Sequence, residues 1–320
     1  HIRDPKVWKK NNRYYMILGG RLKEDKGAVL VYGSEDMKDW KLDRVITTPE
    51  AFGYMWECPD LFELDGQLCL ICCPQGVEKK GYDYWNVHQC VCIPLDYDFT
   101  PGTWVIKTTD NFQMVDRGFD FYAPQTFVDD KGRRILIGWM GMPDAEEEYI
   151  NKTIDEGWQH CLTVPRELKV QNGKILQYPV KELERLRKEK TILHDEKSIA
   201  EIRVEVNEGF DLVLEEIAIT DSSFQISMGG QMIFKYEEGI AEIGFSGIAG
   251  AGRERRKAKI SELRNIRLLA DTSAAEIYLN DGETVFSTRY YPDREDLQLK
   301  ILGGKFRGNL WNLRKMIFTK

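Results

Sequence analysis

The first half of the chain repeats one local pattern three times: an apolar strand end, a short polar turn and a second hydrophobic strand. The three copies read WKKNNRYYMILGGR, LFELDGQLCLICCP and FVDDKGRRILIGWMG. Polar or glycine residues between two hydrophobic runs are typical of a β-hairpin. Several copies of one hairpin type indicate stacked sheets of the same kind, such as the blades of a propeller. The pattern therefore favours an all-β fold over a helical bundle.

Single strands are predicted where a hydrophobic run of four to eight residues lies between turn residues. Such runs occupy Arg13–Gly19, Gly27–Gly33, Gln67–Cys73, Phe121–Val128 and Arg134–Trp139.

The texture of the sequence changes after about residue 180. Val180–Lys190 (VKELERLRKEK) is predicted to be a short surface helix or linker, because Leu183 and Leu186 stand at helical spacing among charges. From about Ile199 to Thr319 apolar and polar residues alternate, with a strong turn motif at Asn280-Asp281-Gly282. We therefore expect a propeller-like domain over 1–180, a linker over 181–195 and a β-sandwich over 196–320.

Charge excludes two classes of partner. The net charge is −7, which argues against nucleic acid or an anionic membrane as the main partner. No run approaches the roughly 20 apolar residues needed to span a bilayer. The basic cluster RERRKAK (Arg253–Lys259) is interpreted as a solvated hairpin face, with a nucleic-acid patch as the alternative.

The cysteines predict the redox environment. Their number, seven, is odd and the chain is long, so a disulfide scaffold is not expected and a reducing cytoplasm fits better. Cys69 and Cys72 have the spacing of a zinc motif, and Cys90 and Cys92 follow. The surrounding LCLICC and VHQCVCIPL segments favour buried strands, in which cysteine serves as a small apolar residue. We expect no metal and no cofactor.

Three acidic residues stand in unusual surroundings. Asp4 lies in Arg3-Asp4-Pro5, Glu57 in WECPD and Asp120 in DFYAPQ. Burial beside a tryptophan would raise the pKa of a glutamate, as a general acid requires. Glycoside hydrolysis needs two carboxyl groups, one to protonate the leaving oxygen and one to attack or to activate water. The alternative for each residue is that it caps a turn or pairs with an arginine.

Several motifs in order carry a resemblance to a known family. The segments HIRDP, WECPDLF, CPQG, DFYAPQTF, GWMG and LTVPREL resemble the motifs of glycoside hydrolase family 32, as does EIYLNDGETVFSTRYYP near the end. That family includes invertases, fructanases and bacterial sucrose-6-phosphate hydrolases. The stretch CPQGVEKKGYDYWNVHQ is most similar to the last of these branches.

The resemblance implies a five-bladed β-propeller followed by a β-sandwich, with a site on the propeller axis. Glu57 matches the general acid/base, and Asp4 the aspartate that stabilises the transition state. The residues implied to bind substrate are Arg3, Asp120, Tyr122, Trp139 and, beside the acid, Cys58. On sequence alone Trp139 fits a core position equally well, Tyr122 could be a strand aromatic, and Arg3 could pair with Asp4.

Two motifs of the family are not found in these residues. The Asn-Asp-Pro-Asn-Gly segment that bears the nucleophile is absent, as is the FSGS-type motif that follows it. Roughly four blades of ~40–45 residues fit before the linker, so we expect the first blade and part of the second to be missing and this chain to be inactive alone.

The resemblance implies retaining hydrolysis of a β-fructofuranoside, a small molecule or an oligosaccharide. It leaves the leaving group open between glucose, glucose 6-phosphate and a fructan, and it leaves the oligomeric state open. The alternatives are a sugar-binding protein without catalysis and a five-bladed glycosidase that acts on arabinose or xylose polymers.

Overall fold

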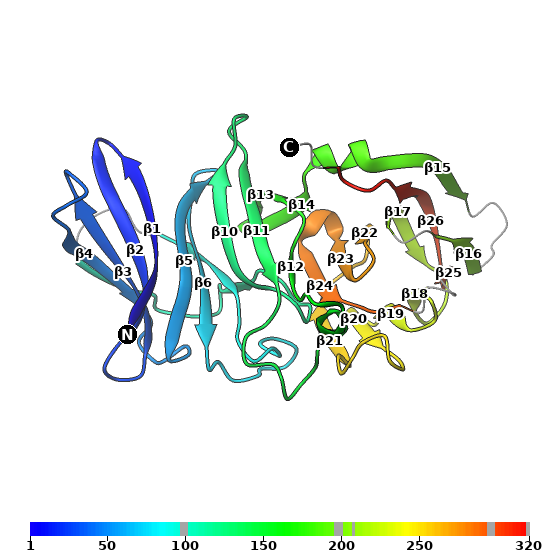
Figure 1. Ribbon diagram of the computed structural model, residues 1–320, viewed down its shortest axis with the longest axis horizontal. Helices are drawn as coiled ribbons and strands as arrows, with labels where there is room; N and C mark the ends of the chain where they lie inside the picture. The colour runs from blue at the N-terminus through cyan, green and yellow to red at the C-terminus, as the bar shows by residue number, and fades with distance from the viewer. Residues whose placement is uncertain (97–101, 195–200, 207–208, 293–297, 318–320) are drawn as a thin grey trace. The chain divides into compact units, whose positions relative to one another are not determined.

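The computed structural model describes residues 1–96, 102–194, 201–206, 209–292 and 298–317. In these ranges the regular elements are strands in five sheets and three short 3-10 helices (Figure 1). The predicted all-β class is therefore confirmed. Contacts divide the chain into two compact units, the first made of His1–Val115, Tyr122–Pro143 and Glu167–Ile175, and the second of the remaining residues. No helix of the described part is long and apolar enough to cross a membrane.

Two sheets lie within the first unit. One has the order β1-β2-β3-β4-β8, with β8 parallel to β4 and the other pairs antiparallel. Its strands are β1 (Ile2–Lys10), β2 (Arg13–Arg21), β3 (Gly27–Ser34), β4 (Lys41–Thr47) and β8 (Gly102–Val105). The other sheet consists of β5 (Met55–Leu64), β6 (Gln67–Gln75), β7 (Val91–Leu95) and β9 (Gln113–Met114).

A third sheet begins in the first unit and ends in residues grouped with the second. It consists of β10 (Tyr122–Val128), β11 (Arg134–Met140), β13 (Arg166–Gln171) and β14 (Lys174–Pro179), with β12 (Cys161–Leu162) beside β11. The first 180 residues thus contain three sheets in their described part, and the estimate of roughly four blades was too high. The long connections 76–90 and 141–165 hold almost no strand residues.

The predicted hairpins form because their turns supply the required backbone. Asn11 and Asn12 both have positive φ (49° and 62°), as do Asp65 and Gly66 (49° and 82°). Two successive positive φ values define the type I′ turn, whose twist matches that of the flanking strands. Asn, Asp and Gly tolerate this backbone best, and the strands predicted around these turns are confirmed as β2 and β6.

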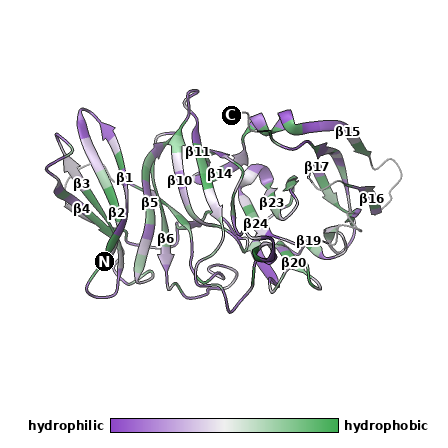
Figure 2. Ribbon diagram, in the orientation of Figure 1, coloured by the Kyte–Doolittle hydropathy of each residue, from purple (hydrophilic) through white to green (hydrophobic). Residues whose placement is uncertain are grey.

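The core of the first unit lies between its first two sheets. Ile17, Val29 and Val31 pack against Trp56 and Leu70, and all five are fully buried. Figure 2 shows hydrophobic stretches along many of the strands, whereas the connections between them are mostly hydrophilic. The cysteines of β6 and β7 are buried free thiols, which confirms that LCLICC and CVCIPL form interior strands.

The second unit contains two six-stranded sheets. The first has the order β15 (Arg187–His194), β26 (Gly304–Leu313), β17 (Phe210–Ile219), β22 (Ile266–Ala270), β23 (Ala274–Leu279) and β24 (Thr284–Arg289). The second has the order β16 (Glu201–Glu205), β25 (Gln298–Leu302), β18 (Phe224–Met228), β19 (Met232–Glu237), β20 (Ile240–Phe245) and β21 (Arg255–Lys259). The 3-10 helices are η1 (Lys152–Glu156), η2 (Lys181–Leu186) and η3 (Asn280–Gly282), and η3 closes the predicted hairpin between β23 and β24.

The expected linker differs from the prediction in part. Residues Lys181–Leu186 form the 3-10 helix η2, but Arg187–His194 form β15, which pairs with β26. The alternation of charges in RKEKTILH reflects an edge strand, whose side chains remain largely exposed, rather than a helix. Residue 195, the last of the expected linker, lies outside the described residues, as do residues 196–200 at the start of the expected sandwich.

A short segment from the first half of the sequence, Asp116–Phe121, is grouped with the second unit. It runs beside β24, where Arg117 donates its N–H to the carbonyl of Val285 and Asp120 donates to that of Ser287. Gly118 lies between these two bonds. A Cβ atom there would lie 1.9 Å from the carbonyl oxygen of Ser287, far inside van der Waals contact.

We therefore predict that Gly118→Ala destabilises the protein by about 1–3 kcal/mol, the usual range for overpacking a close contact. The matched control is Gly209→Ala, whose Cβ would meet its nearest neighbour at 3.5 Å. Urea-induced unfolding of both variants measures the difference. Equal stability of the two variants would show that the segment does not lie against β24.

Candidate active site

Three motifs predicted from the sequence form the same local structure. Each lies at the start of the first strand of its sheet, and in each the ladder register shifts: between Arg3 and Lys6, between Glu57 and Asp60, and between Tyr122 and Gln125. A residue other than glycine has positive φ inside each irregularity, namely Asp4 (60°), Cys58 (48°) and Ala123 (47°). These are β-bulges, which re-aim side chains and recur beside active sites.

Glu57 receives hydrogen bonds from two of the other predicted residues. Arg3 Nη1 donates to Glu57 Oε1 at 2.8 Å, and the Tyr122 hydroxyl donates to Oε2 at 2.8 Å. The Glu57 side chain is 12% exposed and that of Arg3 is 47% exposed, so the pair is open to solvent on the arginine side. Both carboxylate oxygens are thereby oriented, while Glu57 remains accessible to a ligand.

Asp4 is held by the bulge of the neighbouring sheet. Its Oδ2 accepts the backbone N–H of Cys58 at 2.9 Å and lies 3.6 Å from the Cys58 sulfur. Arg3 pairs with Glu57 and not with Asp4, contrary to the alternative considered from the sequence. The two acidic residues predicted to be catalytic are therefore linked, since Asp4 binds the residue that follows Glu57.

Tyr122 and Trp139 are directly opposite each other on β10 and β11. Residues in such a cross-strand pair point to the same face of a sheet. Trp139 is half-buried, and its ring lies over Gly141, where a Cβ would come within 2.4 Å of the indole. Trp139 therefore lies on the same face of the β10–β11 sheet as Tyr122, whose hydroxyl faces Glu57. It is not a fully buried core residue.

Tyr122 is suited to donate a hydrogen bond rather than to accept a proton. Burial raises the pKa of its phenol well above the usual value, and the neighbouring Cys73 and Glu57 raise it further. The ring of His88 lies 6.0 Å from that of Tyr122 and is buried beside it. No sequence motif singled out His88, because a lone histidine in a loop carries no periodic or spacing signal.

Cys58 is a protonated thiol in this site. A hydrogen bond with Cys73, burial, and the nearby Asp4 and Glu57 all raise the pKa of the Cys58 thiol. A thiol that stays protonated is a poor nucleophile. The side chain therefore supports Asp4 rather than attacking a substrate.

Trp56 does not cover Glu57, contrary to the expectation from the sequence. Its indole is fully buried in the core, and its Nε1 donates to the carbonyl of Phe52 at 2.7 Å. Neighbouring residues in a strand point to opposite faces, so Trp56 enters the core while Glu57 faces Arg3 and Tyr122.

Asp120 is also not placed as predicted. It belongs to the second unit and is fully buried, and Arg253 Nη2 and Nε donate to its two carboxylate oxygens at 2.7 Å each. The backbone N–H of Arg289 donates to the same carboxylate. With these partners Asp120 serves the interior of the second unit, and a role in lining an open sugar pocket is wrong for it.

The basic cluster around β21 is corrected by the same contact. Arg253 is 2% exposed, and Arg256 is buried with its guanidinium 4.2 Å from the centre of the Phe119 ring. Only part of the cluster, such as Arg255, faces solvent. The interpretation as a solvated hairpin face was therefore wrong for the two buried arginines. Arg253 pairs with Asp120, which lies 133 positions away in the sequence, and Arg256 packs on the ring of Phe119.

Because Arg253→Met would leave Asp120 as an unpaired buried charge, we predict a loss of about 3–5 kcal/mol in unfolding free energy. Arg255→Met removes an exposed arginine from the same segment and should change it by less than about 0.5 kcal/mol. Thermal and urea unfolding of both variants provide the comparison. A small effect of Arg253→Met would mean that the Asp120 pair is not formed in solution.

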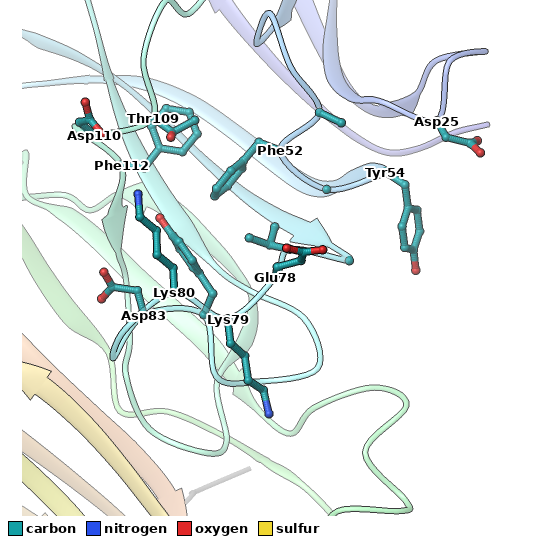
Figure 3. Close-up of a pocket in the computed structure, with 15 residues that line it drawn as sticks. Asp25, Phe52, Tyr54, Glu78, Lys79, Lys80, Asp83, Thr109, Asp110 and Phe112 are labelled. Atoms are coloured by element: carbon teal, nitrogen blue, oxygen red, sulfur yellow. The ribbon is translucent and has the colours of Figure 1, made fainter.

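A separate cavity of about 650 Å³ lies in the first unit, beside the loops that precede β5 and follow β6. Figure 3 shows Phe52 and Phe112 close together with Lys80 nearby, and Tyr54 at the opposite end. The charged residues of its lining are Asp25, Glu78, Asp83, Asp110, Lys79 and Lys80. Acidic groups outnumber basic ones, so the cavity disfavours a phosphate, and Glu57 is not among its lining residues.

No group of three or more His, Cys, Asp or Glu side chains in the part of the chain that the structure describes is arranged to hold a metal ion. Cys69, Cys72, Cys90 and Cys92 instead lie buried within or beside the strands β6 and β7.

Comparison with known families gives two matches. Residues 1–179 match the glycosyl hydrolases family 32 N-terminal domain, and residues 242–308 match the glycosyl hydrolases family 32 C-terminal domain. The sucrose-6-phosphate hydrolase of Bacillus subtilis is 38% identical over 301 residues, which cover 91% of this chain and 62% of that protein. The raffinose invertase of Escherichia coli is 30% identical over 98% of this chain and 67% of its own length.

Solved structures agree with these matches. A sucrose-6-phosphate hydrolase from Lactobacillus gasseri superposes with a TM-score of 0.86 and 25% identity, over 99% of this chain and 67% of that one. A β-fructofuranosidase from Bombyx mori, solved in complex with sucrose, superposes with a TM-score of 0.78 and 28% identity, over 98% and 66%. The chain thus spans about two thirds of the length of these proteins.

Proposed function

Since this chain belongs to glycosyl hydrolase family 32, with its β-propeller followed by a β-sandwich, we propose that the whole protein hydrolyses β-fructofuranosides. The proposed mechanism is double displacement with retention, as for retaining glycosidases in general. The observation that carries the proposal is the constellation around Glu57, in which Arg3, Asp4 and Tyr122 meet from three strands that start three different sheets.

Glu57 is assigned as the general acid/base. It protonates the departing glycosidic oxygen, and it later takes a proton from the water that hydrolyses the fructosyl-enzyme ester at C2 of fructose. Its partial exposure and its hydrogen bonds from Arg3 and Tyr122 support this role, because a general acid must be both oriented and reachable.

Asp4 is assigned as the residue that stabilises the transition state through the fructose hydroxyls. Its Oδ2 is bound by the Cys58 N–H, which fixes the carboxylate and leaves Oδ1 for a sugar. Trp139 is proposed as the aromatic surface under the fructose ring, and Arg3 as a further contact. The nucleophile is proposed to come from an Asn-Asp-Pro-Asn-Gly motif of the whole protein, which residues 1–320 do not contain.

The substrate is proposed to be sucrose or sucrose 6-phosphate. The support is the identity to proteins named sucrose-6-phosphate hydrolase in several bacteria. We propose the cytoplasm as the location, supported by seven free thiols, and a small-molecule sugar, not nucleic acid or a membrane, as the partner.

The test is Glu57→Gln in the full-length protein. We expect kcat/KM for sucrose or sucrose 6-phosphate to fall by about 10²–10⁴, the usual contribution of a general acid. A fructoside with a good leaving group should lose much less in its first step, because it needs little protonation.

Glu63→Gln is the matched control, since Glu63 is on the same strand β5 and its side chain is 58% exposed. This variant should retain wild-type rates on both substrates. Equal losses on the two substrates in Glu57→Gln would make Glu57 a structural residue.

A second test uses residues 1–320 alone. We predict no release of fructose from sucrose, because retention requires a nucleophilic carboxylate in addition to Glu57 and the other candidate, Asp4, is engaged by Cys58. Turnover by this chain, with contaminating invertase excluded by a Glu57→Gln preparation, would show that Asp4 or another carboxylate attacks.

A further inference from the structure

Three residues outside the proposed catalytic set join the same three strands a second time. Lys6 of β1 lies with its Nζ 2.6 Å from Asp60 Oδ2 of β5 and donates to the carbonyl of Thr126 on β10 at 2.6 Å. Thr126 donates both its N–H and its hydroxyl to Asp60 Oδ2, each at 2.7 Å. We refer to Lys6, Asp60 and Thr126 as the three-strand tie.

The tie lies directly after the bulges. Lys6 and Asp60 are the first residues that return to regular pairing in β1 and β5, and Thr126 is the second in β10. The bulges themselves are joined by Asp4 to the N–H of Cys58, and by Gln125 Nε2 to the carbonyl of Cys58 at 3.3 Å. Any slip of β5 along its neighbours would therefore move Glu57 away from Arg3 and Tyr122.

The chemistry of the tie is costly for a purely structural contact. Asp60 is 1% exposed and Lys6 24% exposed, and a buried ion pair seldom stabilises a protein more than apolar residues of the same size. Burial lowers the pKa of Lys6 even though Asp60 opposes the shift. Arg134, the other cation near Asp60, lies over the Phe62 ring with its guanidinium 4.7 Å from the centre. Directional bonds to one oxygen specify register better than apolar packing does.

We propose that Lys6, Asp60 and Thr126 are positioning residues for Glu57, which hold the three bulges in register so that Arg3 and Tyr122 meet its carboxylate. The inference rests on the proposed acid/base role of Glu57. It assigns to the final Asp of WECPD, to Lys6 and to Thr126 a function in catalysis without contact to the substrate.

The test compares three variants of the full-length enzyme. Asp60→Asn removes the charge, Thr126→Val removes the hydroxyl while keeping the volume and the ion pair, and Glu63→Gln is the control. Glu63 pairs with Lys10, so this control breaks a more exposed Lys–carboxylate contact between the same two strands, further from the bulges.

The readouts are kcat and kcat/KM for sucrose across pH, together with thermal unfolding. We expect Asp60→Asn to lower kcat on the order of 10²-fold, as small misplacements of a catalytic group do, and Thr126→Val to lower it less. In both, the alkaline limb of the pH profile, which reports the general acid, should move. Glu63→Gln should match the wild type in rate and in pH profile.

Each outcome decides the matter. If Asp60→Asn does not fold, Thr126→Val alone decides it through the alkaline limb. Loss of thermal stability with unchanged kcat and an unchanged pH profile would overturn the positioning role and leave the tie structural, as would rates equal to those of Glu63→Gln. An inactive wild-type enzyme would instead overturn the proposed function, and the positioning role with it.

Discussion

One extra residue in each of three strands is the constraint on which the site depends. Side chains alternate between the two faces of a strand. In a regular β5, Glu57 and Asp60, which are three positions apart, would therefore point to opposite faces of the sheet. The bulge at Cys58 breaks this alternation, so that both Glu57 and Asp60 can reach side chains of the neighbouring sheets. The same device at Asp4 and Ala123 brings Arg3 and Tyr122 to the same carboxylate.

Positive φ at Asp4, Cys58 and Ala123 is strained backbone that must be held by its surroundings. Here the surroundings are hydrogen bonds between bulges, such as that from Cys58 to Asp4, and the buried ion pair of Lys6 with Asp60. The raised pKa of Tyr122 keeps its phenol protonated as a donor to Glu57. The site is thus organised before a substrate arrives, which is how enzymes lower the cost of reaching the transition state.

The sequence predicted the elements and part of the site for identifiable reasons. The hairpins could be predicted from Asn11-Asn12 and Asp65-Gly66, because their turns require positive φ and these residue types tolerate it. Glu57, Asp4 and Tyr122 were found through their motifs, and the structure brings them together. The bulges were not predicted, because a register shift depends on pairing with a second strand and leaves no periodic trace in the first.

The prediction for Asp120 was wrong for a different reason. Its motif includes Tyr122, but its carboxylate pairs with Arg253, which lies 133 positions away in the sequence. Arg253 belongs to the segment that was interpreted from the sequence as solvated. An ion pair between two distant segments cannot be predicted from the sequence pattern of either segment alone. For Trp56 the error was the opposite one. It precedes Glu57 in the sequence and was expected to contact it, but adjacent residues of a strand point to opposite faces.

The most direct measurement is a crystal structure of the full-length Glu57→Gln protein with sucrose bound. We expect the glycosidic oxygen within about 3 Å of the residue 57 side chain, as a proton donor requires. We also expect fructose hydroxyls on Asp4 and the fructose ring against Trp139. Sucrose bound only in the separate cavity beside Phe52 and Phe112, with residue 57 still engaged by Arg3 and Tyr122 alone, would show that Glu57 is not the general acid.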